Sequence, residues 1–291
     1  MPFTVVVVLH DSAAEVARLL RSVDAHLPER PQLVAVDSGS RDAGPALARD
    51  WGAELVRLPG NLGFGAASNA GVARAEHAAT VLLNPDCVLL DDALARLAAL
   101  ARAHPRALHA PRLLETDGTV QRSAHPLPGT VGAVAAAALH PPLLPRAVRE
   151  RIEPYRGERA RSVGWALGAC LAADTGALRR LGPFDPAVHL FAEDMDLCLR
   201  ARAAGLPTVL HPGLRIVHAG GHATRRDREP FVLLARRRRA VVGAVRGRWA
   251  LTLDDLAQGL TFASRAAGHA VLGGDARRPW RQLGALARAR R

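Results

Sequence analysis

The sequence predicts an α/β fold in which helices cover both faces of a mostly parallel sheet. Short apolar strands alternate with amphipathic helices through the first part of the chain, as in doubly wound sheets. Of the 291 residues, 49% are hydrophobic and 23% are charged, which is typical of a globular protein. Ligands bind at the carboxyl ends of strands in such sheets. The residues that follow the predicted strands, namely Asp11, Asp37, a glycine-rich loop and Asp86, are therefore the first candidates for a site.

Each element of this first part has its own sequence signal. Strands are expected where apolar residues run together, at 4–9, 33–36, 54–58 and 80–83. Helices are expected at 16–23, 45–51, 69–75 and 93–103. The Gly- and Asn-rich stretch 60–68 is expected to form the loop before the third helix.

The second part is less regular. Residues 105–161 are rich in Pro, His and Arg, and we expect an insertion with strands and a flexible loop. Regular patterns return as a strand-like stretch at 162–173, a helix at 175–181, a helix from 191 to 204 and a strand at 208–218. After Arg225 the chain becomes basic and helical.

The formal charge of +12 allows two interpretations. The sequence contains no lysine and uses Ala heavily, so codon bias explains the Arg content as well as selection for a basic surface does. Much of the excess follows Arg225, where Arg236–Arg239 lie beside aliphatic residues. This tail is either a solvated surface or a patch for an anionic membrane, and we expect no nucleic-acid partner.

Three separated cysteines, Cys87, Cys170 and Cys198, form no CxxC pair and fit reduced, buried thiols. The apolar runs 5–9 and 131–139 are too short for a signal peptide or a membrane span. We therefore expect a cytoplasmic protein, with association at the inner face of the cell membrane as an option.

The loop between the third strand and its helix suits a diphosphate. Its small residues allow close backbone approach, and its N–H groups lie before a helix N-terminus. The residues concerned are Asn61, Gly63, Gly65 and Asn69. A dinucleotide site is the alternative, although the spacing is GxxGxG rather than GxGxxG.

Acidic residues supply the remaining candidates. Asp86 in Asn84-Pro85-Asp86 can bind Mg²⁺ or Mn²⁺, although the tripeptide also fits a plain turn. Asp37 can accept hydrogen bonds from a nucleobase or ribose, or cap the next helix. Glu193, Asp194 and Asp196 crowd the first turn of a helix, where the dipole favours them and a base is also possible. His218 is either a metal ligand or a structural loop histidine.

The order of these motifs resembles that of the family 2 glycosyltransferases, and the rhamnosyltransferase-like members most. The motifs are VVVVLHDS, VAVDSGSRD, NLGFGAASNAGVARA, VLLNPD, GAC…LGPFDPAVHLFAEDMDLCLRARAAG and IVHAGGH, spanning Thr4 to His222. The resemblance implies a three-layer GT-A fold. It also implies a nucleotide-sugar-binding half at 1–105, an acceptor-binding and catalytic half at 106–225, and a basic helical tail at 226–291.

The resemblance also implies roles for single residues. Asp37 would contact the base and Asp11 the nucleoside. Asp86 would bind the metal that bridges the donor diphosphate, while Asn84 replaces the first Asp of many members. His218 would be a further metal ligand. Asp194 would be the general base, with Glu193 positioning sugar hydroxyls. Asp185 is present, but Pro186 replaces the usual Glu of that segment.

The implied activity is transfer of a sugar from a nucleotide-diphosphate donor to an acceptor hydroxyl, with Mg²⁺ or Mn²⁺. A single in-line displacement predicts inversion at the anomeric carbon. The expected donor is dTDP-rhamnose or a UDP-sugar, and the expected acceptor is a polyprenyl-linked or cell-envelope glycan. A sugar-1-phosphate nucleotidyltransferase would need a basic glycine loop after the first strand, which His10-Asp11-Ser12 replaces. An inactive sugar-nucleotide-binding or membrane-associated scaffold remains the other alternative.

Overall fold

The computed structural model describes residues 2–138, 145–182, 184–185, 192–220, 230–271 and 274–290. These residues form two compact units, each with its own contacts. The first comprises Met1–Ala124 with Tyr155–Ala223, and the second His125–Pro154 with Thr224–Arg291.

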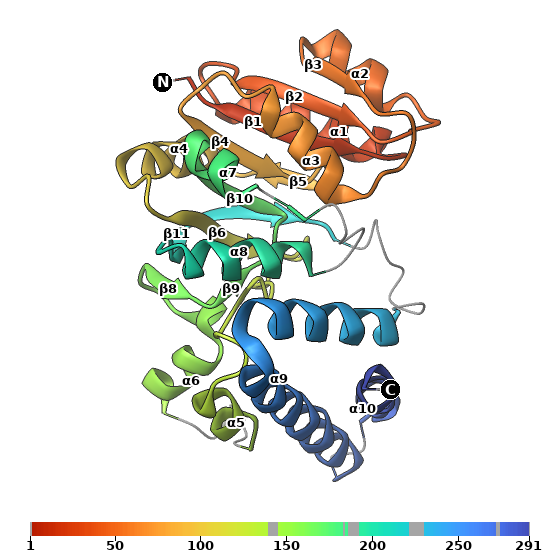
Figure 1. Ribbon diagram of the computed structural model, residues 1–291. Helices are drawn as coiled ribbons and strands as arrows, with labels where there is room; N and C mark the ends of the chain where they lie inside the picture. Colours follow the sequence, from red (N-terminus) through yellow and green to blue (C-terminus); the bar gives the residue numbers. More distant parts are fainter. Residues whose placement is uncertain are drawn as a thin grey trace. The chain divides into compact units, whose positions relative to one another are not determined.

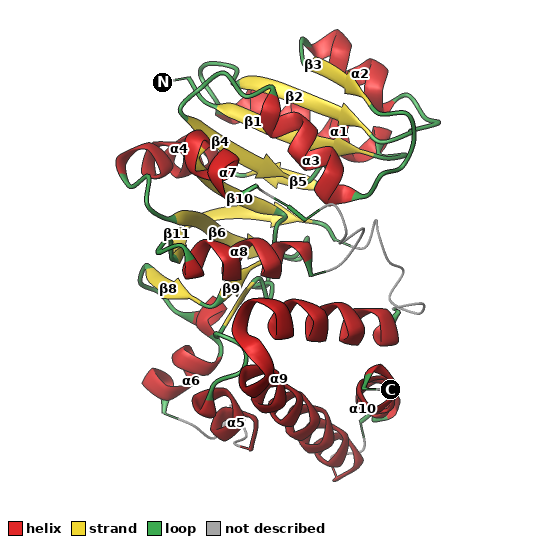
Figure 2. Ribbon diagram, viewed as in Figure 1, coloured by secondary structure: helices red, strands yellow, loops and turns green. Residues whose placement is uncertain are grey.

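The first unit is built on a nine-stranded sheet with the order β3-β2-β1-β4-β10-β6-β11-β5, in which β8 also pairs with β11 (Figures 1 and 2). Its strands are β1 (Thr4–Leu9), β2 (Gln32–Asp37), β3 (Glu54–Arg57), β4 (Ala79–Leu83), β5 (Cys87–Leu89), β6 (Leu108–Leu114), β8 (Arg161–Val163), β10 (Cys170–Asp174) and β11 (Thr208–His218). The ladders make β1, β2, β3, β4, β6 and β11 run one way, and β5, β8 and β10 the other. The predicted mostly parallel sheet is confirmed.

Helices cover both faces of this sheet. They are α1 (Ala13–His26), α2 (Gly44–Trp51), α3 (Phe64–Ala73), α4 (Ala93–Ala103), α7 (Thr175–Leu181) and α8 (Glu193–Ala203). Since side chains alternate along a strand, Val5 and Val7 of β1 pack with residues of α1, α2 and α4. Val6 of the same strand packs with residues of α3, α7 and α8. The predicted three-layer α/β/α arrangement is thereby confirmed.

Two sequence predictions about this unit are wrong. The third helix begins at Phe64 rather than Asn69, so Gly65 and Ser68 lie in the helix and not in the loop. The segment 105–161 contains strands, as predicted, but it is not an insertion, because it contributes β6, an interior strand between β10 and β11. Pro111 obscures this strand in the sequence, since proline cannot donate to a ladder. The β6–β11 register shifts after the Pro111–His211 pair, and this irregularity accommodates it.

The second unit is helical. It contains α5 (Val131–Ala138), α6 (Arg146–Ile152), α9 (Phe231–Val271) and α10 (Arg277–Ala289), and the helical tail predicted after Arg225 is confirmed. Gly247, with φ 80° and ψ 173°, kinks α9. A Cβ at Gly129 would lie 2.4 Å from the carbonyl oxygen of Ala250, so this glycine permits close packing beside α9. A short ladder pairs β7 (Ala124–His125) with β9 (Trp165–Ala166), and a 3-10 turn spans Pro154–Arg156. None of the described helices is both long enough and apolar enough to cross a membrane.

Candidate active site

The carboxyl ends of β1 and β2 place Asp11 and Asp37 beside each other, because Leu9 pairs with Asp37 in the parallel ladder. Asp37 accepts a hydrogen bond from the Ser40 backbone N–H at 2.8 Å, which is the turn-forming contact that the sequence allows. Asp11 has a positive φ of 48° and accepts from the Arg41 N–H at 2.7 Å. That bond lowers the pKa of the Asp11 carboxyl. Both loops are therefore held in defined conformations by their own acidic side chains.

His10 connects these loops to the glycine loop, a role that no sequence pattern indicates. Its Nδ1 lies 2.9 Å from the Ser38 carbonyl oxygen and its Nε2 lies 3.3 Å from the Asn61 amide nitrogen. Asn61 in turn accepts from the Gly63 N–H at 3.0 Å. Gly63 has φ 87°, a left-handed value that favours glycine, just before α3 begins. The ends of β1, β2 and β3 thus form one connected edge.

Two other residues of the predicted donor loop have different surroundings. Gly65 is buried in the first turn of α3. The Asn69 amide donates to the carbonyl oxygen of Phe184 at 2.8 Å and accepts from its N–H at 3.0 Å. The ring of Phe184 is buried and meets Phe64 edge-on. Asn69 is therefore engaged in holding the 184 segment against α3.

Asn84, Asp86 and His218 come together at the end of β4. The register places His218 of β11 opposite Cys87, and the Ala219 N–H donates to the Asp86 carbonyl oxygen at 3.0 Å. His218 Nε2 lies 3.3 Å from Asp86 Oδ1 and 3.4 Å from the Asn84 amide nitrogen. The Asn84 amide oxygen is buried and has no hydrogen-bond partner among the described residues.

This arrangement contains one carboxylate, one imidazole and one amide. Among the residues that the structure describes, no three His, Cys, Asp or Glu side chains form a group that could hold a metal ion. His218 Nδ1 faces the Gln121 amide oxygen at 2.9 Å. Gln121 lies in the segment that the sequence analysis treated as irregular, so no pattern marked it.

Asp194 lies in the first turn of α8, beside Glu193 and after Ala192, whose φ is 68°. Its carboxylate accepts from the Gly168 N–H at 3.2 Å and from the Met195 N–H at 2.7 Å. Burial raises the pKa of Asp194, and these two backbone hydrogen bonds act in the opposite direction. Raised basicity is the property that a proton acceptor requires.

The turn 167–169 connects Asp194 with the Asn84 segment. Gly168 donates to Asp194, and the next residue, Ala169, accepts from the Asn84 N–H at 2.9 Å through its carbonyl oxygen. A Cβ at Gly168 would lie 3.2 Å from the Asp194 Cβ, so a side chain here would press on that residue. This turn fixes the spacing between the acidic helix and the carboxyl end of β4.

The remaining acidic candidates have structural or peripheral positions. Asp196 forms an ion pair with Arg200 at 2.7 Å, and Arg200 also donates to the carbonyl oxygens of Leu181 and Gly182. Asp196 therefore connects α8 to the end of α7. Asp185 is exposed, while Pro186 and His222 lie outside the described residues.

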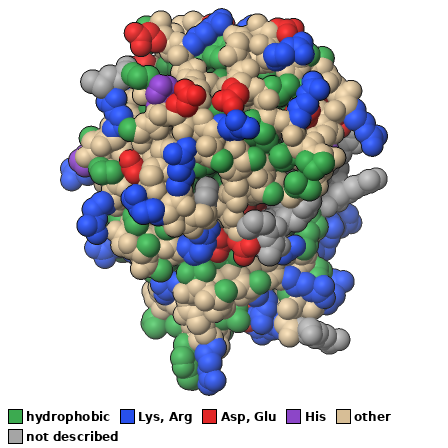
Figure 3. All heavy atoms as spheres, turned by 45° about the horizontal axis from the view of Figure 1, so that its top comes forward, with side chains coloured by type: hydrophobic (Ala, Val, Ile, Leu, Met, Phe, Trp, Pro, Cys, Tyr) green, Lys and Arg blue, Asp and Glu red, His purple; other side chains and the backbone are tan. Residues whose placement is uncertain are grey.

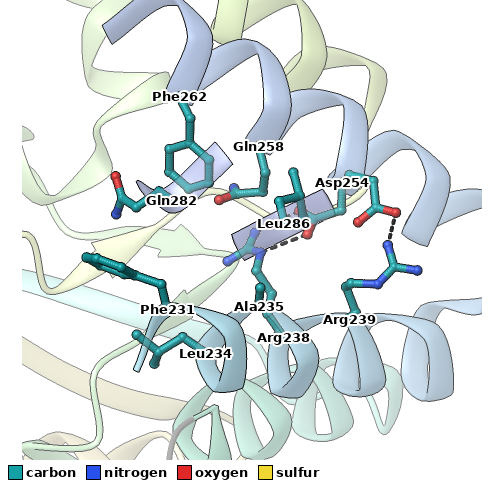
Figure 4. Close-up of a pocket in the computed structure, with 11 residues that line it drawn as sticks. Phe231, Leu234, Ala235, Arg238, Arg239, Asp254, Gln258, Phe262, Gln282 and Leu286 are labelled. Carbon is teal, nitrogen blue, oxygen red and sulfur yellow. Dashed lines mark hydrogen bonds and ion pairs between the residues drawn. The ribbon is translucent and has the colours of Figure 1, made fainter. Parts of the chain in front are cut away.

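The second unit has a cavity of about 110 Å³ of its own (Figure 4). Two ion pairs, Arg238–Asp254 and Arg239–Asp255, join the two parts of α9 across it. The cavity is lined by Phe231, Leu234, Ala235, Arg238, Arg239, Asp254, Asp255, Gln258, Phe262, Gln282 and Leu286. Because removal of one partner would leave an uncompensated charge in a partly buried place, each pair depends on both of its members.

A three-layer α/β/α unit with acidic and amide side chains at the carboxyl ends of its strands fits the class of GT-A glycosyltransferases. The chain belongs to the family described as "Glycosyl transferase family 2", because the sequence model of that family matches residues 4–168. Proteins from two strains of Mycobacterium tuberculosis, described as N-acetylglucosaminyl-diphospho-decaprenol L-rhamnosyltransferase, are 29% identical over 242 residues. The match covers 77% of this chain and 78% of theirs.

Solved structures confirm the fold. The mannosyltransferase PcManGT from Pyrobaculum calidifontis, in complex with GDP-Man and Mn²⁺, has a TM-score of 0.62 and 19% identity. The match covers 98% of this chain and 85% of that one. S. aureus TarS in complex with UDP-GlcNAc has a TM-score of 0.56 and 15% identity, covering 99% and 80%. The predicted family, fold class and glycosyl transfer function are confirmed.

Proposed function

We propose that this chain transfers a sugar, with inversion, from a nucleotide-diphosphate donor to an acceptor hydroxyl, assisted by a divalent cation. The convergence of Asp86, Asn84 and His218 at the end of β4 carries the proposal. The mycobacterial relatives are described as rhamnosyltransferases that act on a decaprenol-linked sugar. Their description favours dTDP-rhamnose over a UDP-sugar as donor, and a polyprenyl-linked or cell-envelope glycan as acceptor.

The donor occupies the edge formed by the ends of β1, β2 and β3. Asp37 contacts the base, Asp11 the nucleoside, and the 61–63 turn the diphosphate. In this proposal residues 1–105 bind the nucleotide sugar, residues 106–225 bind the acceptor and carry the catalytic base, and 226–291 form the basic tail. Backbone N–H groups already hold the Asp11 and Asp37 side chains in place by hydrogen bonds. This supports their roles, because side chains that are ordered before binding lose little conformational entropy when the ligand binds.

The residues at the end of β4 fit Mg²⁺ or Mn²⁺. Magnesium and manganese sites use few protein oxygens together with substrate phosphates. Asp86 and His218 would hold the cation, and the buried amide oxygen of Asn84 lacks any other described partner. When bound, the cation neutralises the negative charge of the departing diphosphate.

Asp194 accepts the proton of the acceptor hydroxyl as that oxygen attacks the anomeric carbon. Its carboxylate is half-buried and held by the N–H groups of Gly168 and Met195, so its orientation is fixed before substrate binds. Glu193, the neighbouring half-buried residue, positions sugar hydroxyls. A single displacement with attack opposite the leaving group inverts the anomeric centre, and no covalent intermediate is required.

Nucleotide binding tests the donor site. We would titrate dTDP, UDP and GDP into the intact protein by calorimetry, with and without Mn²⁺, and repeat the titration with Asp86→Ala and with the exposed-residue control Asp50→Ala. We expect Mn²⁺-dependent binding of one nucleotide that Asp86→Ala loses and Asp50→Ala retains. Absence of any nucleotide binding in the folded protein would contradict the proposed activity.

A further inference from the structure

The orientation of the His218 ring can be worked out from its neighbours. Gln121 donates through its amide nitrogen to Glu115 Oε1 at 3.2 Å. An ionised carboxylate only accepts hydrogen bonds, so the amide nitrogen of Gln121 must face Glu115 and its oxygen must face His218. The 2.9 Å contact between that oxygen and His218 Nδ1 then requires the hydrogen on Nδ1.

A hydrogen on Nδ1 leaves the lone pair of the neutral ring on Nε2. That atom lies 3.3 Å from Asp86 Oδ1 and 3.4 Å from the Asn84 amide nitrogen, from which it accepts a hydrogen bond. Two acceptors that face each other at this distance repel unless a proton or a cation lies with them. A ring fixed in this tautomer is prepared to bind a metal ion through Nε2.

The Gln121 side chain is supplied by a tight hairpin that follows β6. Leu114 and Val120 form a bridge, the Glu115 N–H donates to the Thr119 carbonyl oxygen at 2.8 Å, and the Gln121 N–H donates to the Leu113 carbonyl oxygen at 2.9 Å. The turn includes Gly118 with φ 82°. Leu114 also pairs with Val217 in the β6–β11 ladder, and His218 is the next residue after Val217. The ladder therefore fixes the position of the hairpin relative to His218.

We infer that Gln121, oriented by Glu115, is a positioning residue that fixes His218 with an unprotonated Nε2 toward Asp86 and thereby sets the affinity for the divalent cation. This inference rests on the proposed function, since it needs a metal ion at Asp86 and His218.

The test compares Gln121→Leu, which removes the acceptor for Nδ1–H, with Gln121→Glu, which retains one. Val120→Ala, on the neighbouring and partly exposed hairpin residue, is the matched control. Mn²⁺ binding is measured by calorimetry and by electron paramagnetic resonance, with dTDP or UDP present. We expect Gln121→Leu to bind Mn²⁺ roughly 10–100-fold more weakly, as other outer partners of metal-binding histidines do. Val120→Ala should stay close to the unaltered protein, and Gln121→Glu, which keeps the acceptor for Nδ1–H but loses the donor to Glu115, should bind Mn²⁺ more tightly than Gln121→Leu.

A second readout does not depend on metal or turnover. Two-bond ¹H–¹⁵N spectra of the metal-free protein report the His218 tautomer, assigned by comparison with His218→Gln. We expect the Nδ1–H form in the unaltered protein and a mixture in Gln121→Leu. Glu115→Ala, which loosens the amide without touching His218, should shift the population in the same direction and serves if Gln121→Leu does not fold.

The outcomes separate this inference from the proposed function. If the unaltered protein binds no Mn²⁺ with any nucleotide present, the metal-assisted function is contradicted. If Mn²⁺ binds but Gln121→Leu changes neither its affinity nor the tautomer, the function stands and the positioning inference is overturned.

Discussion

At the scale of single residues, Asp194 provides the most direct prediction. Gly168 donates to one carboxylate oxygen of Asp194 and Met195 to the other. Asn has a single oxygen, so it can keep one of these hydrogen bonds, and it cannot take a proton. We expect Asp194→Asn to lower kcat by roughly 10²–10⁴-fold, the contribution of a positioned general base, and to leave nucleotide affinity unchanged. Turnover of a labelled donor, with calorimetry of the nucleotide, measures both quantities.

The control for this change is Asp196→Asn, two residues along α8. Asp196 pairs with Arg200, so its loss should lower the melting temperature and leave kcat nearly intact. Burial raises the pKa of Asp194, so the turnover of the unaltered enzyme should rise with pH through a range above that of an ordinary Asp. Equal kcat values for Asp194→Asn and the unaltered enzyme would exclude Asp194 as the base.

The residues that the sequence marked and those that it missed differ in a physical way. Asp37 and Asp86 were predictable because they follow apolar strands, and strand ends of a doubly wound sheet face one edge. His10 and Gln121 act through contacts to residues 51 and 97 positions away, respectively. No periodicity or local motif reports a contact of that length, so only the folded chain identifies them.

At the scale of elements, the packing of α3 on β1 depends on Gly71. A Cβ at this position would lie 2.3 Å from Val6 Cγ1 and 3.1 Å from Val36 Cγ2. We expect Gly71→Ala to destabilise the protein by roughly 1–3 kcal/mol, the cost of overpacking a closely packed interior. Denaturant unfolding followed by circular dichroism measures the change. Gly60→Ala, where an added Cβ meets nothing within 4 Å, should leave stability almost unaltered.

A pair of histidines, the buried His109 on β6 and the half-buried His211 on β11, predicts a pH effect on stability. His109 Nε2 faces the His104 carbonyl oxygen at 3.2 Å, and its Nδ1 faces His211 Nε2 at 2.9 Å. Burial lowers the pKa of both side chains, and that of His211 to about 4, with the His109 charge as a further cause. In the unfolded chain an ordinary histidine has a pKa near 6.5.

Because the folded-state pKa is depressed, the unfolded chain binds more protons between about pH 6.5 and 4. Stability is therefore retained above this window and lost as the pH falls through it, by up to about 1.4 kcal/mol per pH unit for one proton. His211→Gln keeps a donor for His109 but does not titrate, so its stability should depend less on pH in this window. Unfolding curves at several pH values, compared between the two proteins, would show parallel dependence if the prediction is wrong.

The elements also show where sequence patterns lose information. Helix α3 begins inside a stretch of Gly, Ala and Asn whose composition indicates a loop, and the helix forms because small residues let it approach β1 and β2. Strand β6 contains His109 and Pro111, which weaken any strand pattern, yet its place between β10 and β11 buries it. In both cases tertiary packing overrides the local preference.

At the scale of the whole molecule, the basic surplus requires an explanation. On the face drawn in Figure 3, Arg side chains are spread widely with acidic side chains among them, which favours a solvated surface there. The helical unit also carries exposed aromatic side chains beside its Arg residues. Trp249 of α9 and Trp280 of α10 are 74% and 58% exposed. Arg248 lies over the Trp249 ring, and Arg278 and Arg281 flank Trp280 in the chain.

Exposed Trp beside Arg is the composition of a membrane–water interface. The indole ring suits the headgroup region, and each Arg near an anionic surface contributes about 1 kcal/mol. We therefore expect the protein to sediment with vesicles that contain an anionic lipid, and not with zwitterionic vesicles. Binding should fall as salt is raised, because ions screen the attraction.

The double change Trp249→Ser and Trp280→Ser should weaken vesicle binding without changing the donor site. Leu47→Ser, at an exposed apolar residue of α2, is the matched control and should bind vesicles like the unaltered protein. If binding to anionic vesicles is absent, or is the same with zwitterionic ones, the Arg content of this unit serves as a solvated surface. Codon bias then remains the explanation for the missing lysine. The acceptor must in that case reach the enzyme without help from binding of residues 226–291 to a membrane.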